Sequence, residues 1–363
     1  MKTAVNKFIA FNQPDISEAE IDAVSDVMRS GWLGNGPKAK QFEDLFAKEG
    51  EHCVAVNSCT IGITLALKAE GISQWDQVIT TPLTFGATVN AILAAGGAPR
   101  FVDVDKNGLI DVSKIEKSIR PNTRAIVPVH LHGAQCDMDS ILKIAKKHDL
   151  VVIEDAAHSF GGPSIVGDYG VYSFYPTKNI TTGDGGMVVT RDRLKANKIR
   201  LMSSQGLSAD AWMRYGSGPV KEYSIVSEGF KGAMNDLAAS IGIVQLQRWN
   251  HISTRRNLVW NVYEEAFGER PKEHSRHIYS IPVSNRDEFR KRLHLRGIGT
   301  GIHYKPLHLE PAYKFLHYQP GDFRMAEKIG SETMSLPLSP KMTVEDAYAV
   351  VNAVKEIKGE LNG

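Results

Sequence analysis

The sequence has few cysteines and no excess of charge of either sign. Its 363 residues include three cysteines, Cys53, Cys59 and Cys136, whose spacing shows no Cys-x-x-Cys pair and no Cys/His ligand pattern. We therefore expect neither a disulfide framework nor a metal site, and a reducing cytoplasm fits. Lysine and arginine total 43 against 41 aspartates and glutamates. This balance gives no argument for binding nucleic acid or an anionic membrane, so small molecules are the expected partners.

Long hydrophobic runs are also missing. No apolar stretch approaches the length of a transmembrane helix, and the first eight residues, MKTAVNKF, lack the apolar core of a signal peptide. Hydrophobic residues make up 42% of the chain and charged residues 23%, which is typical of a globular protein and not of a disordered one. We therefore expect a soluble, cytoplasmic protein with one large domain and a smaller one.

Short β-branched runs alternate with helical patterns from about residue 54 to residue 190. This alternation is typical of a sheet built from βαβ units, with helices on both faces. After the strand that begins at residue 54, the expected strands are 78–80, 99–102, 125–129, 151–154, 171–174 and 187–190. The expected helices, which carry the 3.6-residue apolar period, are 60–70, 86–95, 112–119 and 138–148. The fold class is therefore α/β.

The two ends of the chain differ from this central pattern. Near the N-terminus, Ser17 is the expected N-cap of a helix, and a glycine-rich loop at 31–37 separates that helix from the next one. After about residue 249 we expect an arginine-rich helix, a strand at 278–283, a helix at 286–296 and a strand at 300–304. We place a domain boundary near residue 250, between a large domain (1–250) and a small α+β domain (251–363).

Lys178 is the most informative residue of the sequence. It lies in the run SFYPTKNITTGDGG (173–186), with the hydroxyl of Ser173 before it and glycines after it. A lysine in this setting suits an aldehyde cofactor held as a Schiff base. Taken alone, an exposed loop lysine is the commoner interpretation, because lysine is mostly a surface residue. Other segments therefore decide between the two.

Three of these segments follow expected strands. Cys59 and Thr60 begin a helix whose first-turn N–H groups could bind phosphate, although threonine is also an ordinary helix cap. Phe85 lies at a strand-to-helix turn, where its ring could stack on a planar ligand or simply fill a core. Asp155 ends a strand, three residues before His158, and a carboxylate there could keep a pyridine nitrogen protonated or cap a surface turn.

The ordered set of these motifs resembles the DegT/DnrJ/EryC1/StrS family of sugar aminotransferases. The motifs are NSCT (57–60), TFGAT (84–88), EDAAH (154–158), Ser173 with Lys178, and GDGG (183–186), and the resemblance extends over nearly the whole chain, from Ile16 to His308. It implies the fold-type-I aminotransferase scaffold, with a mostly parallel seven-stranded sheet in the large domain. It also implies pyridoxal 5'-phosphate as the cofactor.

The resemblance implies a role for each motif residue. Lys178 would be the Schiff-base lysine, Asp155 would pair with the pyridine nitrogen, Phe85 would stack on the ring, and His158 would lie near the phenolic oxygen. The phosphate would be held by Cys59, Thr60 and Ser173 of the same subunit and by Asn235 of a partner subunit, which implies a homodimer with shared active sites. Four residues lie in loops that border the sugar nucleotide in this family, with local packing as the alternative for each: Trp32, Tyr304, Lys305 and His308.

The implied reaction moves an amino group from an amino acid, with L-glutamate expected, to a keto sugar. The stretch 206–215, with 229–246 after it, resembles the branch that acts at C4 of UDP-linked 4-keto hexoses, in lipopolysaccharide and other surface amino-sugar pathways. A cyclitol or a non-nucleotide keto sugar stays open as the acceptor. A related sugar dehydratase would carry histidine in place of Lys178. A regulator on the same fold would need a helix-turn-helix module, for which we expect neither the room nor the charge.

Overall fold

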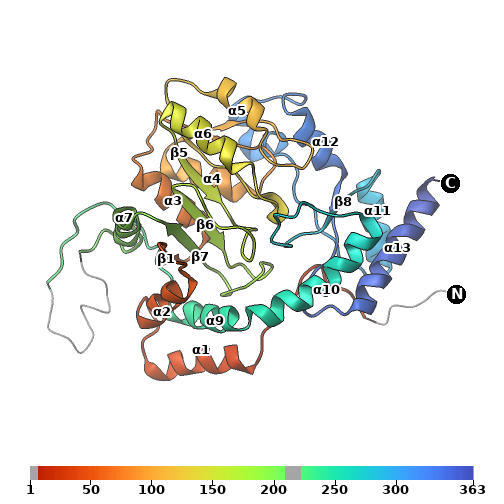
Figure 1. The fold of residues 1–363 in the computed structure, drawn as a ribbon, viewed down its shortest axis with the longest axis horizontal. Helices are drawn as coiled ribbons and strands as arrows, with labels where there is room; N and C mark the ends of the chain where they lie inside the picture. The colour runs from red at the N-terminus through yellow and green to blue at the C-terminus, as the bar shows by residue number, and fades with distance from the viewer. Residues whose placement is uncertain (1–6, 209–221, 363) are drawn as a thin grey trace.

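A seven-stranded sheet forms the centre of the protein. The computed structural model describes residues 7–208 and 222–362, and Figure 1 shows their arrangement. The strand order is β1-β7-β6-β5-β4-β2-β3. Only β7 runs opposite to its neighbours, β1 and β6, so the predicted α/β class with a mostly parallel sheet is confirmed. The strands are β1 (His52–Val56), β2 (Gln77–Thr80), β3 (Ala98–Phe101), β4 (Thr123–Ile126), β5 (Val151–Asp155), β6 (Tyr169–Ser173) and β7 (Gly186–Thr190).

Alternate residues of each strand point to opposite helical layers, because the side-chain period of a strand is two. In β1, Val54 and Val56 belong to one core, whereas Cys53 and Ala55 belong to another on the other face. The first face is covered by α3 (Cys59–Ala69), α4 (Gly86–Ala95) and α7 (Arg193–Ser203). The second is covered by α2 (Pro37–Phe46) and α9 (Asp236–Gln247) near β1, and by α5 (Val112–Ser118) and α6 (Met138–His148) near β4.

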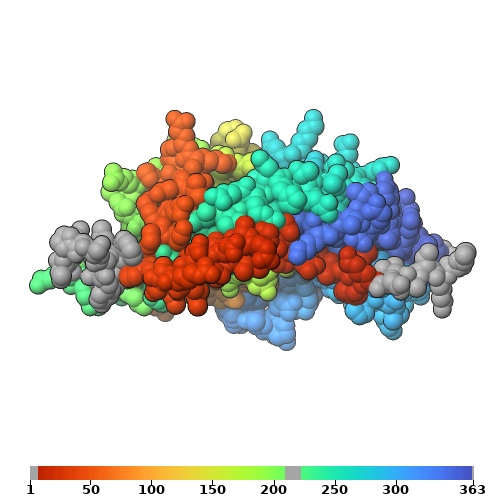
Figure 2. Space-filling view, turned by 90° about the horizontal axis from the view of Figure 1, so that it is seen from below, coloured from red at the N-terminus to blue at the C-terminus, as the bar shows by residue number. Residues whose placement is uncertain are grey.

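The helix ends follow the sequence signals closely. Helix α1 (Glu18–Ser30) begins after N-cap Ser17, whose side chain forms a capping box with Glu20, and it ends at Gly31 in the left-handed conformation, with φ 74°. Helices α4 and α6 match their predicted bounds. Figure 2 shows α1 lying along α9, which continues into α10 (Trp249–Phe267).

A second core lies at the C-terminal end of the chain. It joins α10, α11 (Arg286–Leu295) and α13 (Val344–Asn362) to a two-stranded sheet of β8 (Ser280–Pro282) and β9 (Thr333–Ser335). The segment between α11 and β9 contains η2 (Leu307–Leu309), η3 (Pro311–Leu316) and α12 (Arg324–Glu332), and it packs against the core of the large sheet. The boundary near residue 250 stays a prediction. Within the described ranges, no helix is both long and apolar enough to cross a bilayer.

The predicted strand at 300–304 is wrong. Only Gly301 pairs with a strand, by exchanging two hydrogen bonds with Ser335 of β9 at 3.0 and 2.9 Å. The next residues leave the small sheet, and His303 and Tyr304 line a pocket beside the large one. The side chains of Ile302, His303 and Tyr304 instead line the pocket, and the Tyr304 ring lies 5.8 Å from the ring of Phe85.

Candidate active site

A pocket of about 640 Å³ lies at the carboxyl ends of the parallel strands, where ligands bind in open α/β sheets. Its far wall is the segment 301–304. Most of the predicted site residues line this pocket: Cys59, Thr60, Phe85, Asp155, His158, Ser173, Lys178 and Tyr304. The βαβ topology brings these residues together although they are spread over more than 240 positions of the sequence.

Lys178 lies in the loop that joins β6 to β7. Its backbone N–H donates to the carbonyl oxygen of Tyr175 at 2.9 Å, which closes a turn and directs the side chain to the pocket. Burial lowers the pKa of Lys178 to about 8, although electrostatic interactions with Cys59 and Asp155 oppose the shift. A buried ammonium loses hydration, so its neutral form becomes accessible near physiological pH. The amine can therefore act as a nucleophile and as a base.

Two asparagines fix the loop on either side of Lys178. Asn179 is buried, and its Nδ2 donates to the carbonyl oxygens of Phe160 at 2.8 Å and Ser275 at 2.9 Å. Asn12 Nδ2 donates to the carbonyl oxygens of Thr177 at 3.0 Å and Leu338 at 3.1 Å. The loop is therefore tied to the N-terminal segment and to the C-terminal core.

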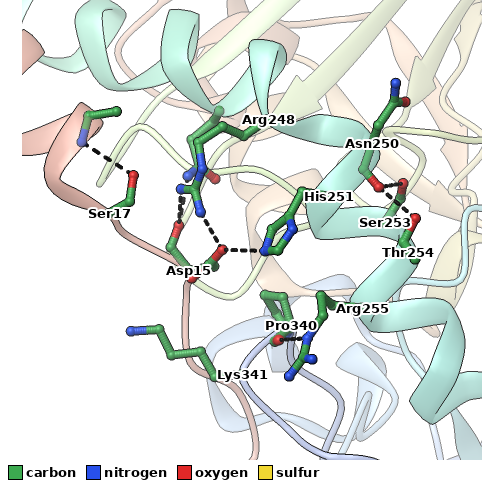
Figure 3. A network of polar contacts seen from close by, with 12 residues as sticks. Asp15, Ser17, Arg248, Asn250, His251, Ser253, Thr254, Arg255, Pro340 and Lys341 are labelled. Carbon is green, nitrogen blue, oxygen red and sulfur yellow. Dashed lines mark hydrogen bonds and ion pairs between the residues drawn. The ribbon is translucent and has the colours of Figure 1, made fainter.

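A polar network holds the N-terminal segment beside the start of α10 (Figure 3). Arg248 donates to Asp15 Oδ2 and to Glu20 Oε1, each at 2.6 Å, and His251 Nε2 lies 3.7 Å from the same Asp15 oxygen. Gln245 extends the network inward, because its Nε2 donates to Glu20 Oε1 at 2.7 Å and its Oε1 accepts from the N–H of Thr181 at 3.4 Å. The far end of the Lys178 loop is thus anchored to α1.

Asp155 ends β5 and faces the pocket from its floor. Its Oδ2 accepts from the hydroxyl of Thr88 at 2.7 Å, and its Oδ1 accepts from the N–H of Ala157 at 3.2 Å. Burial raises the pKa of Asp155, whereas these two hydrogen bonds and the charge of Lys178 favour the carboxylate. A cation placed against this carboxyl would therefore keep it ionised.

The start of α3 forms the other end of the pocket. Ser58 is the N-cap and its Oγ accepts from the N–H of Ile61 at 3.2 Å, so the N–H groups of Cys59 and Thr60 remain as first-turn donors without an intrahelical acceptor. Gly186 allows β7 to approach this turn, because a Cβ there would lie 2.7 Å from the Cys59 nitrogen. Ser173 is the strand partner of Gly186 and lies at the same end of the pocket. These donors can hold a phosphate group.

His158 and Tyr304 line the pocket between these two ends. The N–H of His132 donates to His158 Nδ1 at 3.1 Å, so the neutral ring carries its proton on Nε2, which lies 3.3 Å from the hydroxyl of Tyr304. Burial and nearby positive charge lower the pKa of His158 well below its ordinary value. Tyr304 also lies 5.8 Å from the ring of Phe85, whose side chain is 63% exposed and available for stacking.

Four predicted site residues lie outside the residues that line this pocket. Trp32 Nε1 donates to the carbonyl oxygen of Asn35 at 3.2 Å, and Lys305 pairs with Glu310 at 3.3 Å. His308 is 4% exposed, with its Nε2 2.9 Å from Glu327. Asn235 caps α9 by accepting from the N–H of Ala238 at 2.8 Å, and it is exposed. Residues 209–215 of the stretch 206–215 lie outside the described residues.

The structure adds residues that the sequence reasoning missed. Thr88 is the hydrogen-bond donor to Asp155, and Phe11 and His303 line the pocket from the N-terminal segment and the segment 301–304. The spacing of Thr84 and Thr88, one turn apart at the start of a helix, was a visible signal, and their hydroxyls lie 2.9 Å apart. Nothing in the sequence indicated that this turn lies against β5. No three histidine, cysteine, aspartate or glutamate side chains are placed to hold a metal ion in the described ranges.

The pocket fits pyridoxal phosphate on its own geometry. A reactive amine, a buried carboxyl and unused helix amides face one space, and each matches a different part of that cofactor. Together with the sheet topology, they define a pyridoxal phosphate-dependent aminotransferase of fold type I.

The comparisons with known proteins agree with this class. Residues 14–355 match the model of the DegT/DnrJ/EryC1/StrS aminotransferase family, and the chain belongs to this family. It is 43% identical to the uncharacterized protein MJ1066 of Methanocaldococcus jannaschii and 41% identical to the spore coat polysaccharide biosynthesis protein SpsC of Bacillus subtilis, covering 97% of each. The PMP form of Spr1654, a proposed sugar aminotransferase of Streptococcus pneumoniae, superimposes with a TM-score of 0.90 at 30% identity, over 97% of this chain and 99% of that one. The protein is therefore a pyridoxal phosphate-dependent sugar aminotransferase.

Proposed function

We propose that this protein transfers the amino group of L-glutamate to C4 of a UDP-linked 4-keto hexose, in the cytoplasm, for the synthesis of lipopolysaccharide or another surface polysaccharide. The observation that carries the catalytic part is the Lys178 amine, which is buried with a lowered pKa in the same pocket as Asp155. The involvement of SpsC in spore coat polysaccharide synthesis supports the assignment to a surface sugar. The loops 301–304 and 84–88 leave a pocket of about 640 Å³, which has room for a sugar beside a cofactor.

Each lining residue has a task in this proposal. Bound pyridoxal phosphate supplies an electron sink that stabilises negative charge at the carbon losing a proton. Lys178 would hold the cofactor through its amine, and the free amine would accept the proton lost from the α-carbon of the amino donor. Asp155, whose carboxylate accepts a hydrogen bond from Thr88, would pair with the pyridine nitrogen of the cofactor and keep it protonated. His158 offers its Nε2–H to an oxygen of the ligand, and the first turn of α3 binds the phosphate.

The proposal includes a homodimer in which Asn235 reaches the partner's phosphate site. Asn235 uses only its Oδ1 to cap α9, and its exposed position leaves the Nδ2 group available to a second subunit. We expect Asn235→Asp, which keeps the cap, to weaken cofactor binding without changing the oligomeric state. Sedimentation of the parent as a monomer at assay concentrations would contradict the dimer.

Visible absorbance tests the catalytic assignment. The parent incubated with pyridoxal phosphate should show an absorbance band that shifts when glutamate is added, and Lys178→Ala should give neither the band nor turnover. Lys146→Ala, at an exposed position of α6 that does not line the pocket, is the matched control and should keep both. A parent without a band would refute the role of Lys178.

A panel of acceptors tests the substrate. We expect mass spectrometry to detect an aminated product from UDP-linked 4-keto hexoses. Amination of a cyclitol ketone or of a free keto sugar alone would favour the alternative acceptor and leave the aminotransferase assignment intact.

A further inference from the structure

A small recess adjoins the main pocket and shares Lys178 with it. It has a volume of about 30 Å³, enough for a water molecule and far too small for a sugar. Its polar lining comes from Lys178, Thr177, His158, His277, His303, Tyr304 and Asn12. The main pocket shares most of these residues, whereas His277 and Asn12 line the recess and not the main pocket. His277 therefore contacts the site through the recess and not through the main pocket.

The hydrogen bonds of Asn179 fix the tautomer of His277. Because Asn179 Nδ2 donates to two backbone carbonyl oxygens, Phe160 O and Ser275 O, its Oδ1 must be the atom that faces the histidine. The distance from this Oδ1 to His277 Nδ1 is 3.1 Å. An amide oxygen only accepts, so Nδ1 carries the proton. In the neutral ring, Nε2 is then an unprotonated acceptor.

The neighbouring histidine has the opposite arrangement. The rings of His158 and His277 lie 4.7 Å apart. His158 accepts a backbone N–H at Nδ1 and so presents a donor at Nε2. His277 donates at Nδ1 and presents an acceptor at Nε2. The two rings, tilted by 46° to each other, both line the recess, one with a hydrogen-bond donor at Nε2 and the other with an acceptor there.

We propose that His277 is a positioning residue for the Lys178 amine, which it holds through one water molecule in the recess. The amine and the water have protons to donate, and the Nε2 lone pair of His277 is the acceptor that terminates the chain. This contact directs the amine to a defined place when it is not bonded to a ligand. The inference rests on the proposed role of Lys178 for its catalytic meaning, whereas the contact itself is independent of any ligand.

The charged and titratable groups around this pair come from several elements. Arg256 of α10, which donates to the His277 carbonyl oxygen at 2.7 Å, adds a buried positive charge. Burial and the charges of Lys178 and Arg256 lower the pKa of His277 well below its ordinary value, so it stays a neutral acceptor at physiological pH. The other groups that act on Lys178 or His277 are Cys59, Asp155, His132 and His303.

A pair of isosteric variants tests the proposal on the full chain without cofactor. His277→Gln places an amide oxygen near the position of Nε2, whereas His277→Met has a similar shape and no comparable acceptor. Both lose the contact with Asn179, so the difference between them isolates the acceptor. The pKa of Lys178 is measured from the pH dependence of its acetylation by trace acetic anhydride, followed by peptide mass spectrometry over roughly pH 6 to 10.

An acceptor for the ammonium favours the charged form, so its loss lowers the pKa of Lys178. We expect a fall of about one pH unit in His277→Met relative to His277→Gln, with the glutamine variant near the parent. Thermal unfolding shows that both variants are folded before labelling. Equal Lys178 pKa values in the two variants would overturn the proposal, as would an equal fall in both. If the Lys178 pKa falls in His277→Met alone but the parent shows no visible band with pyridoxal phosphate, the catalytic assignment is refuted and the contact is not.

Discussion

Thr88 offers a sharp test of how the pocket controls Asp155. Thr88 is 1% exposed, and its hydroxyl donates to Asp155 Oδ2 at 2.7 Å while it accepts from Thr84 at 2.9 Å. Thr88→Val keeps the shape of the side chain and removes the donor. A hydrogen bond to a buried charged group contributes about 1.5–3 kcal/mol, so its loss raises the pKa of Asp155 further.

The sign of the pH dependence follows from this rise. A carboxyl with a raised native pKa binds protons more tightly in the folded state than in the unfolded state, so it lowers stability at neutral pH. We expect Thr88→Val to lower the free energy of unfolding of the cofactor-free protein by about 1.5–3 kcal/mol at pH 7. The part of this loss that comes from the Asp155 charge begins to shrink when the pH falls below the native pKa of Asp155 in the variant. It reaches zero when the pH is also below the lower native pKa of Asp155 in the parent.

Urea unfolding at a series of pH values measures the effect. Thr88→Ser keeps the hydroxyl and is the control, so it should lose less stability and show no added pH dependence. The unsatisfied Thr84 hydroxyl adds a cost that does not vary with pH. A loss in Thr88→Val that is the same at every pH would refute the argument, because it would show that packing alone had changed.

Three further predictions concern other parts of the chain. Gly62→Ala should lower stability by about 1–3 kcal/mol in urea unfolding, because its Cβ would lie 2.6 Å from a methyl group of Val171, whereas Gly359→Ala, with open space around it, should not. Gln245→Leu should lower the free energy of unfolding by about 1–3 kcal/mol, because it removes buried hydrogen bonds, whereas Gln247→Leu at an exposed position should leave it unchanged. Equal unfolding midpoints for the two variants would contradict this prediction. The rate at which cofactor-free protein takes up pyridoxal phosphate should rise about tenfold per pH unit below about pH 8 and then level off, because only the neutral Lys178 amine attacks. A rate independent of pH would show that uptake does not depend on deprotonation of this amine.

Local sequence signals predicted the elements well where one rule dominated. The apolar period located α4 and α6 at their observed bounds, and the serine-glutamate pattern located the start of α1. Asp155 could be placed at a strand end because the strand before it is short, β-branched and buried. These features depend on contacts within a few residues, which the sequence displays directly.

Contacts between distant segments could not be predicted in the same way. The place of His308 beside the sugar stays a prediction, and its hydrogen bond with Glu327 of α12 is a contact that spacing alone does not indicate. The Thr88 bond to Asp155 joins two elements 67 positions apart. The stretch 300–304 has the composition of a strand, yet the small sheet already pairs β8 with β9. Tertiary packing decides each of these cases.

The reversed direction of β7 has a consequence for how the reactive lysine is carried. Because β6 and β7 are antiparallel, Ser173 and Gly186 face each other, and the chain between them is a hairpin loop and not a helical crossover. The loop that carries Lys178 therefore begins and ends at the same end of the sheet, where β6 stops and β7 starts. Insertions or deletions in this loop would move the amine relative to the pocket without changing the register of any strand. Its length is a separate variable through which related chains could adjust the reach of the lysine to acceptors of different size.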